Sequence, residues 1–119
     1  MFINLSNHPS DRWSKEQLVA AQKYGEIIDI AFPKIDANCS EEDVDKIVED
    51  YYKKVLEYDN PTVMVQGEFT FTYRLVSKLK EKGLNVLASC TQREVEIVDN
   101  PDGTVNKTSI FKFVRYREY

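Results

Sequence analysis

The sequence predicts a single α/β domain, residues 1–119, built on a parallel β-sheet, and three observations support this fold class. Short apolar segments alternate along the chain with segments whose apolar residues recur at helical spacing. Strands that alternate with helices usually pair in parallel through right-handed crossovers. The length of 119 residues and the hydrophobic share of 42% suit one domain whose core needs no disulfide or metal.

Four apolar segments are predicted to be the parallel strands. They span residues 2–5, 26–32, 62–66 and 84–88. Each is followed by polar residues, proline or glycine, which interrupt strand pairing.

Three helices are predicted between these strands. The first begins after Ser14, which opens a capping-box pattern, and ends at Gly25. The second begins after Ser40 and has an acidic first turn, which suits the positive end of a helix dipole. The third covers residues 69–83, where apolar residues recur at helical spacing up to a glycine.

The C-terminal part of the chain predicts an antiparallel hairpin. Residues 94–98 and 109–114 alternate in polarity and flank the turn-forming residues 100–103, Asn-Pro-Asp-Gly. Together these elements predict a Rossmann-like parallel sheet of about four strands, with helices on both faces and the hairpin at one edge.

Composition argues against several functions. The net charge is −4 and acidic residues concentrate in residues 41–59, so we expect no binding of duplex nucleic acid. Cys39 and Cys90 lack metal-ligand spacing and are expected to be free thiols. No signal-peptide pattern and no membrane-spanning apolar run occur, which predicts a cytoplasmic protein without membrane contact. The nucleotide fingerprints GxGxxG and the phosphate-loop lysine are missing, which argues against ordinary NAD or ATP enzymes, and no cofactor is expected. Without metal-ligand spacing of the cysteines, no metal site is expected either.

A ligand-binding site is predicted where the carboxyl ends of the parallel strands meet, because loops and helix N-termini converge there. Residues 6–13, 66–72 and 89–93 follow three strand ends and are rich in hydroxyl, amide and charged groups. The candidate ligand-binding residues are Ser6, Asn7, Gln66, Gly67, Glu68, Phe69, Thr70, Thr72, Ser89 and Cys90.

His8 and Arg93 are the candidates for proton transfer and phosphate binding. His8 is the only histidine and can exchange protons near neutral pH, although a histidine before a proline can equally hold a loop by hydrogen bonds. The Arg93 guanidinium matches a phosphate in bidentate geometry. Its alternative role is a surface ion pair with Glu68 or Glu96.

The segment after the third strand also has two interpretations. Gly67 permits close approach of the backbone to a ligand, and Thr70 and Thr72 stand where a helix begins and can bond a phosphate. Alternatively, Thr70 caps the helix and the phenylalanines belong to the core. We favour ligand binding. Glu68 either orients a ribose hydroxyl or balances the helix dipole.

These segments resemble the small CRISPR-associated Rossmann-like proteins of type III systems, which are compact relatives of the ring nucleases that degrade cyclic oligoadenylates. The resemblance rests on residues 5–9 (LSNHP), 65–69 (VQGEF) with Thr72-Tyr73, 89–93 (SCTQR) and 111–119 (FKFVRYREY). It implies a protein that binds a cyclic oligoadenylate. It also implies a homodimer, because two copies of one site suit a ring with two-fold symmetry.

A ring nuclease of this kind needs no metal, because the ribose 2′-hydroxyl attacks its neighbouring phosphate. The resemblance implies catalytic roles for His8, Thr91 and Arg93, with His8 as the proton-transfer group. Phosphate would be held by Arg93, Thr91 and the backbone at Gly67, and ribose by Thr70 and Glu68.

Two other functions remain open from the sequence. A sensor or sponge would bind the same ring without cleaving it. A protein-interaction module would use the acidic helix within residues 41–59 and the aromatic tail 115–119 to contact a protein partner.

Overall fold

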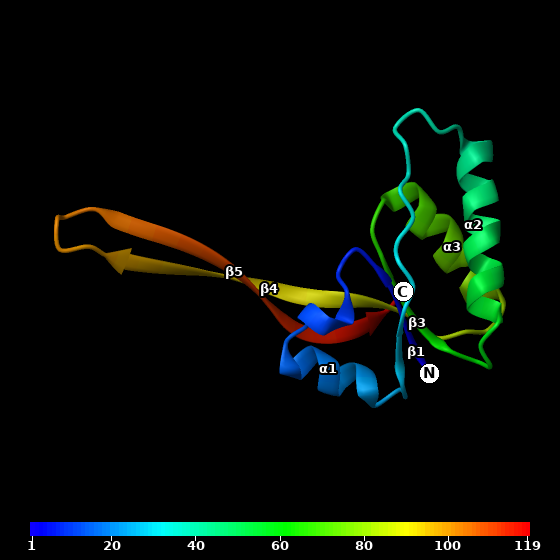
Figure 1. Ribbon diagram of the computed structural model, residues 1–119, viewed down its shortest axis with the longest axis horizontal. Coiled ribbons are helices and arrows are strands. Elements are labelled where there is room, and N and C mark those ends of the chain that lie inside the picture. Colours follow the sequence, from blue (N-terminus) through cyan, green and yellow to red (C-terminus); the bar gives the residue numbers. More distant parts are fainter.

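The computed structural model describes residues 1–119 and contains one five-stranded sheet with helices on both faces (Figure 1). The strand order is β2-β1-β3-β4-β5. Strands β1 to β4 are parallel, and β5 is antiparallel to β4. The predicted α/β class is therefore confirmed. The strands are β1 (Phe2–Ser6), β2 (Ile27–Asp29), β3 (Thr62–Gln66), β4 (Val86–Asp99) and β5 (Val105–Glu118).

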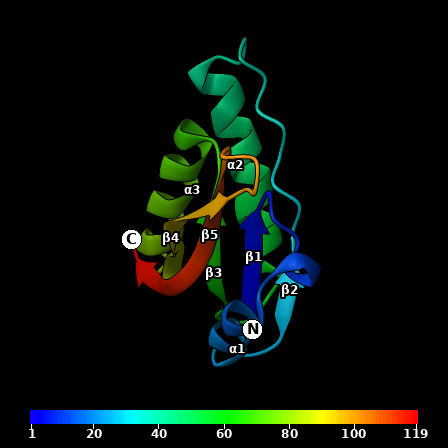
Figure 2. The ribbon, with the colours of Figure 1, turned by 90° about the vertical axis from the view of Figure 1, so that its left-hand side faces the viewer.

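Alternation along the central strands divides the core into two parts, because successive side chains of a strand point to opposite faces. Ile3 and Leu5 of β1 face the larger core, which is covered by α2 (Glu41–Leu56) and α3 (Phe69–Glu81). Phe2 faces the smaller core, which contains Met64, Leu87 and Tyr116 and is covered by α1 (Lys15–Gln22). Figure 2 shows β3, β1 and β2 side by side.

The helices begin where the sequence predicts. Ser14 accepts a hydrogen bond from the Gln17 N–H at the start of α1. Ser40 and Asp43 form a reciprocal capping box at the start of α2, with bonds of 3.1 and 3.2 Å. The only other helix is the short 3-10 helix η1 (Ser10–Arg12). No helix is both long enough and apolar enough to cross a membrane.

Strand β2 is shorter than its apolar sequence predicts. Pairing covers Ile27–Asp29, and one further bond joins the Ile30 N–H to the Asn4 carbonyl at 2.9 Å. Beyond this point Phe32 and Ile35 pack against the larger core instead of continuing the strand. The apolar character of residues 30–35 therefore reflects burial of side chains and not strand pairing.

The prediction that residues 89–93 follow the end of the fourth strand is wrong, because these residues lie inside β4. Strand β4 pairs with β3 only through Leu87, and from there to Asp99 it pairs with β5. Since β5 supplies the hydrogen bonds along this whole stretch, polar residues remain in the strand. The sheet thus has one long final hairpin in place of a fourth strand followed by a separate hairpin.

The outer part of this hairpin, residues 91–113, projects from the body and is called the hairpin arm below (Figure 1). It helps to give the chain extents of 57 × 38 × 21 Å. At the base of the arm Cys90 pairs with Arg115 and Thr91 with Phe113, so Val114 is an extra, bulged residue. Such bulges bend a strand and increase its twist.

Candidate binding site

A groove of about 990 Å³ opens at the carboxyl ends of the central strands. From β1 the chain continues to β2, which pairs with one edge of β1, whereas β3 pairs with its other edge. Open α/β sheets bind ligands at such a switch point, beyond the carboxyl ends of the strands. Ser6 and Gln66 are paired in register at the ends of β1 and β3, and both line the groove.

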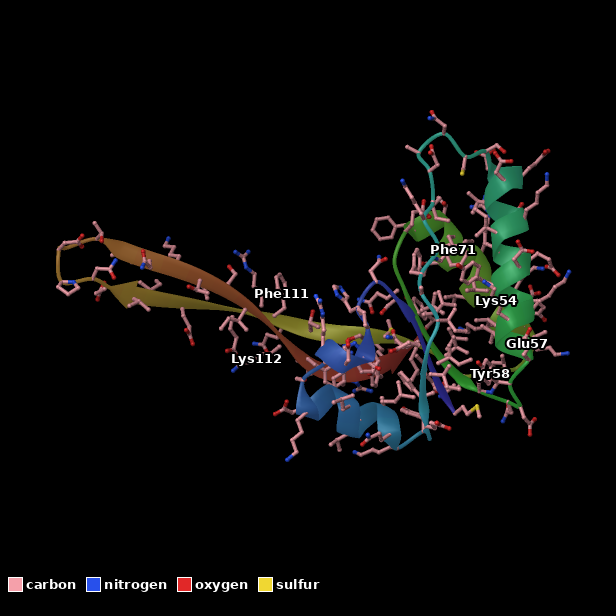
Figure 3. The ribbon with its side chains drawn as sticks, in the orientation of Figure 1. Lys54, Glu57, Tyr58, Phe71, Phe111 and Lys112 are labelled. Carbon is pink, nitrogen blue, oxygen red and sulfur yellow. The ribbon has the colours of Figure 1, made fainter.

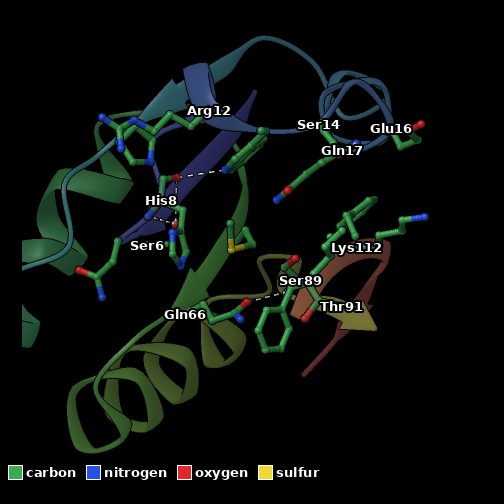
Figure 4. A pocket seen from close by; sticks show the side chains of 17 residues that line it. Ser6, His8, Arg12, Ser14, Glu16, Gln17, Gln66, Ser89, Thr91 and Lys112 are labelled. Atoms are coloured by element: carbon green, nitrogen blue, oxygen red, sulfur yellow. Dashed lines mark hydrogen bonds between the residues drawn. The ribbon is translucent and has the colours of Figure 1, made fainter. Parts of the chain in front are cut away.

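The two walls of the groove come from distant parts of the chain (Figure 4). One wall is formed by the segment after β1, from Asn7 to Gln17, and the other by β4 and the base of the hairpin arm. The lining combines two cations, one carboxylate (Glu16), three aromatic rings, one histidine and several hydroxyl and amide groups. These residues include Arg12, Lys112, Trp13, Phe111, Phe113, His8, Asn7, Ser14, Gln17, Ser89 and Thr91.

A buried hydrogen-bond network holds the first wall in place. Asn4 is 1% exposed, and its Nδ2 donates to the His8 carbonyl at 2.8 Å and to Asp29 Oδ1 at 2.9 Å. Ser6 Oγ donates to Asn4 Oδ1 at 2.6 Å and accepts from the His8 N–H at 3.2 Å. Trp13 Nε1 donates to the same His8 carbonyl at 3.1 Å. These hydrogen bonds therefore fix the backbone of the loop after β1 to the strand itself.

Asp29 connects this loop to β2 as well. Its carboxylate accepts the Ser10 hydroxyl at 2.8 Å and the Ser10 N–H at 3.3 Å, in addition to the Asn4 amide. Both sides of the loop are thus anchored. Sites held by such supporting hydrogen bonds keep their side chains in defined positions.

His8 holds the loop through its backbone, whereas its imidazole makes no hydrogen bond within the chain. All hydrogen bonds of this residue use its carbonyl or its N–H. The exposed imidazole lines the groove and is available to a ligand. This arrangement combines a fixed backbone with an imidazole that is free to bond a ligand.

The groove brings together only part of the predicted site. Ser6, Asn7, His8, Gln66, Ser89 and Thr91 line it. Gly67, Glu68, Phe69, Thr70, Thr72, Cys90 and Arg93 do not. Within the first group Gln66 also has a structural bond, since its Oε1 accepts the Ser89 N–H at 2.9 Å where the pairing of β3 with β4 has ended.

Gly67 is explained by packing and not by a ligand. A Cβ at this position would lie 2.3 Å from Cζ of the Phe32 ring. That ring packs edge-on against Phe71, with ring centroids 5.1 Å apart. The glycine therefore makes room for an aromatic ring of the larger core.

Replacing Gly67 with alanine is expected to lower the free energy of unfolding by about 1–3 kcal/mol, because Phe32 must move from its packed position. Urea denaturation measures this loss. In the matched background Phe32→Leu, the same glycine replacement should cost clearly less. Equal costs in the two backgrounds would show that the contact with Phe32 is not the cause.

Glu68, and not Thr70, caps helix α3. Its Oε1 accepts the Phe71 N–H at 2.8 Å, and Thr70 Oγ1 donates to both carboxylate oxygens at 2.7 and 2.8 Å. The Phe71 N–H, followed by the Thr70 hydroxyl, holds the pKa of Glu68 below its ordinary value. A carboxylate already occupies this helix N-terminus, so a phosphate there would meet like charge.

The other residues of this segment are divided between core and surface. Phe71 is fully buried, whereas Phe69 is 89% exposed and touches neither the core nor the groove. Thr72 is buried in the first turns of α3, and its hydroxyl has no hydrogen-bond partner. The assignment of both phenylalanines to the core is therefore correct only for Phe71.

Arg93 lies on the hairpin arm, outside the groove. Its Nε and Nη2 donate to Ser109 Oγ on β5 at 3.2 and 2.9 Å, and it pairs with neither Glu68 nor Glu96. The reason is the continuation of β4, which carries residue 93 away from the strand ends. Cys90 stays near the body as a half-buried free thiol.

The cations that do line the groove are Arg12 and Lys112, which sequence reasoning did not select. Arg12 belongs to η1, within the segment already expected to bind a ligand. Lys112 comes from β5 and reaches the groove because it pairs with Gln92 near the base of the arm. The hydrogen bond to Glu94, 3.0 Å away, raises the pKa of Lys112, so this side chain remains a cation.

Fold and groove define a small α/β protein with a polar, aromatic-lined site at the carboxyl edge of its sheet. The chain belongs to the uncharacterized protein MJ1673 family, whose model matches residues 1–117. The match includes both walls of the groove and the hairpin arm. No curated protein and no solved structure matches the chain.

Proposed function

We propose that this protein binds a cyclic oligoadenylate in the groove. The observation that carries the proposal is the combination of Arg12 and Lys112 with Trp13, Phe111 and Phe113 around the strand ends. Cations pair with phosphates, and aromatic rings stack on bases without requiring a particular sequence. A ring of adenylates offers both groups in alternation.

Two further points favour an oligonucleotide ring over a single nucleotide. The groove, at about 990 Å³, lies at the upper end of the range of about 300–1,000 Å³ for small-molecule sites. The resemblance to small CRISPR-associated Rossmann-like proteins also points to cyclic oligoadenylates. In this proposal the protein works in the cytoplasm, in type III antiviral defence, with Cys39 and Cys90 as free thiols.

The proposal includes cleavage of the ring, with His8 as the proton-transfer group. The ribose 2′-oxygen forms a bond to the adjacent phosphorus while the bond from phosphorus to the 5′-oxygen breaks. His8 takes the proton from the 2′-hydroxyl, and the departing 5′-oxygen takes a proton from water, so the opened chain carries a 2′,3′-cyclic phosphate at one end and a 5′-hydroxyl at the other. Arg12 and Lys112 take over the phosphate-binding role first assigned to Arg93, and Ser89 and Thr91 offer hydroxyl donors.

Incubation with cyclic tri-, tetra- and hexa-adenylate in the presence of a chelator tests both parts of the proposal. We expect at least one ring to raise the melting temperature and to be converted to linear products. His8→Ala should retain binding and lose at least about 100-fold in turnover, because the proton-transfer group is removed. Chromatography of the mixtures and a melting curve on each report the two effects.

Each alternative outcome has a definite meaning. Intact rings together with a raised melting temperature would contradict cleavage and identify a sensor or sponge. Full turnover by His8→Ala would contradict the role of the imidazole. An unchanged melting temperature with all three rings, and no products, would contradict the whole proposal and favour the protein-interaction module.

A further inference from the structure

The hairpin arm has one apolar side that nothing in the chain covers. Residues directly opposite each other in the β4–β5 ladder share a side of the ribbon. One side carries the pairs Arg93–Phe111, Val95–Ser109, Ile97–Lys107 and Asp99–Val105, and is called the apolar arm face below. Its four apolar side chains are 50–68% exposed.

The opposite side of the arm is mainly polar. It carries Glu94, Glu96 and Lys112, with an ion pair of 3.0 Å between Lys112 and Glu94, and only two apolar side chains, Val98 and Ile110. Figure 3 shows Phe111 and Lys112 on opposite sides of the ribbon. A two-stranded ribbon with one apolar side and one polar side is the pattern expected when the apolar side packs on something.

The arm also needs support for its own stability. A two-stranded hairpin without a packing partner is at best marginally stable in water. Beyond Leu87, β4 pairs only with β5, and no helix is packed on the outer part of the ribbon (Figure 1). The seven half-exposed apolar residues of this ribbon are Val95, Ile97, Val98, Val105, Ile110, Phe111 and Val114.

We propose that the apolar arm face packs on the same face of a second copy of the chain, with the two arms antiparallel about a two-fold axis. This arrangement places β4 over β4 and β5 over β5, with the base of each arm over the tip of the other. Arg93 then faces Asp99 of the partner subunit, so opposite charges meet. On the neighbouring positions apolar side chains meet, with Val95 over Ile97 and Phe111 over Val105, and the polar Ser109 lies over Lys107 and not over an apolar group.

Other pairings of two arms lack this complementarity. Parallel arms would place Ile97 over Lys107 and Val95 over Ser109, which buries a charge and a hydroxyl against apolar groups. Edge-to-edge pairing of β4 with β4 would bring Glu94 and Glu96 of the two copies onto neighbouring strands, where like charges repel. Pairing of β5 with β5 would do the same with Lys107 and Lys112.

The proposed dimer is independent of the ligand proposal, although the two surfaces touch. Phe111 belongs to the apolar arm face and also lines the groove. The tip of the partner arm therefore lies next to the mouth of the groove. Loss of the dimer would leave the groove in each chain, and loss of ligand binding would leave the arms.

Sedimentation equilibrium of the full chain over a range of concentrations tests the pairing of the arms. We expect a dimer that dissociates on dilution. Ile97→Glu should raise the dissociation constant at least about tenfold, because it places a charge in the centre of the apolar interface. Val98→Glu is the matched control, since Val98 is next in the chain, 51% exposed and on the polar side.

A charge exchange tests the antiparallel arrangement itself. Arg93→Glu and Asp99→Arg should each weaken the dimer, and the double variant should restore it. Within one chain these residues lie about 20 Å apart along β4, too far for an ion pair, so restoration has to be intermolecular. A monomer at all concentrations, equal effects of Ile97→Glu and Val98→Glu, or no restoration by the double variant would overturn the proposal. Circular dichroism of each variant checks that the body remains folded.

Discussion

Asn4→Ala is expected to lower the free energy of unfolding by about 2–4 kcal/mol and to abolish ligand binding. The Asn4 amide joins β1 to the His8 carbonyl and to Asp29, and its carbonyl oxygen accepts the Ser6 hydroxyl. Its removal leaves several buried or half-buried polar groups short of partners, each at a cost of about 1–3 kcal/mol. Because this amide also anchors the wall that carries His8, Arg12 and Trp13, the groove loses its shape.

Urea denaturation measures the first effect, and a ligand titration of the folded variant measures the second. Asn7→Ala is the matched control, because Asn7 is exposed, lines the groove and makes no hydrogen bond through its side chain. Its replacement should change stability by no more than about 0.5 kcal/mol. If Asn4→Ala were as stable as the wild type and bound ligand equally well, the network would not be what holds the groove.

Removal of both groove cations, in Arg12→Ala with Lys112→Ala, is expected to weaken binding of the cyclic oligoadenylate by at least about 100-fold. Each hydrogen bond from a charged donor contributes about 1.5–3 kcal/mol, which is roughly tenfold or more in affinity. Lys112 exchanges its partner Glu94 for a phosphate, and such an exposed ion pair stabilises the free protein little. The salt dependence of binding should also become shallower in this variant.

Calorimetric titration at two salt concentrations measures both effects. The double variant Lys23→Ala with Arg117→Ala is the control, because it removes the same charge from exposed positions outside the groove. Equal losses of affinity in the two double variants would mean that net charge, and not the groove, attracts the ligand.

Much of the fold could be predicted because its signals are local. The starts of the first two helices follow from Ser14 and Ser40, and that of the third from the helical spacing that begins at Phe69. The apolar segments at β1 and β3 match the observed strands. The continuation of β4 through residues 89–93 could not be predicted, since a strand of polar residues is stabilised by the hydrogen bonds of a distant partner. The short β2 escaped prediction for a related reason: Ile30 and Phe32 are apolar for packing on the larger core.

The candidate site could be predicted only in part, as the fold could. Residues at or just after the ends of predicted strands, such as Ser6, His8 and Gln66, could be located from the sequence. Lys112 and Phe111 could not, because their approach to the groove depends on the register of β5 and its bulge at Val114. Glu68 and Gly67 have the chemistry of a ligand site, but local capping and the Phe32 ring account for them.

Binding in the groove can be measured most directly through Trp13, the single tryptophan of the chain, whose indole lines the groove. We would titrate the wild-type protein with cyclic tri-, tetra- and hexa-adenylate in the presence of a chelator and follow the indole fluorescence. Saturable quenching by at least one ring, weakened in the double variant Arg12→Ala with Lys112→Ala, is the predicted result. Fluorescence that stays unchanged with every ring, together with an unchanged melting temperature, would contradict the assignment of the groove to cyclic oligoadenylate.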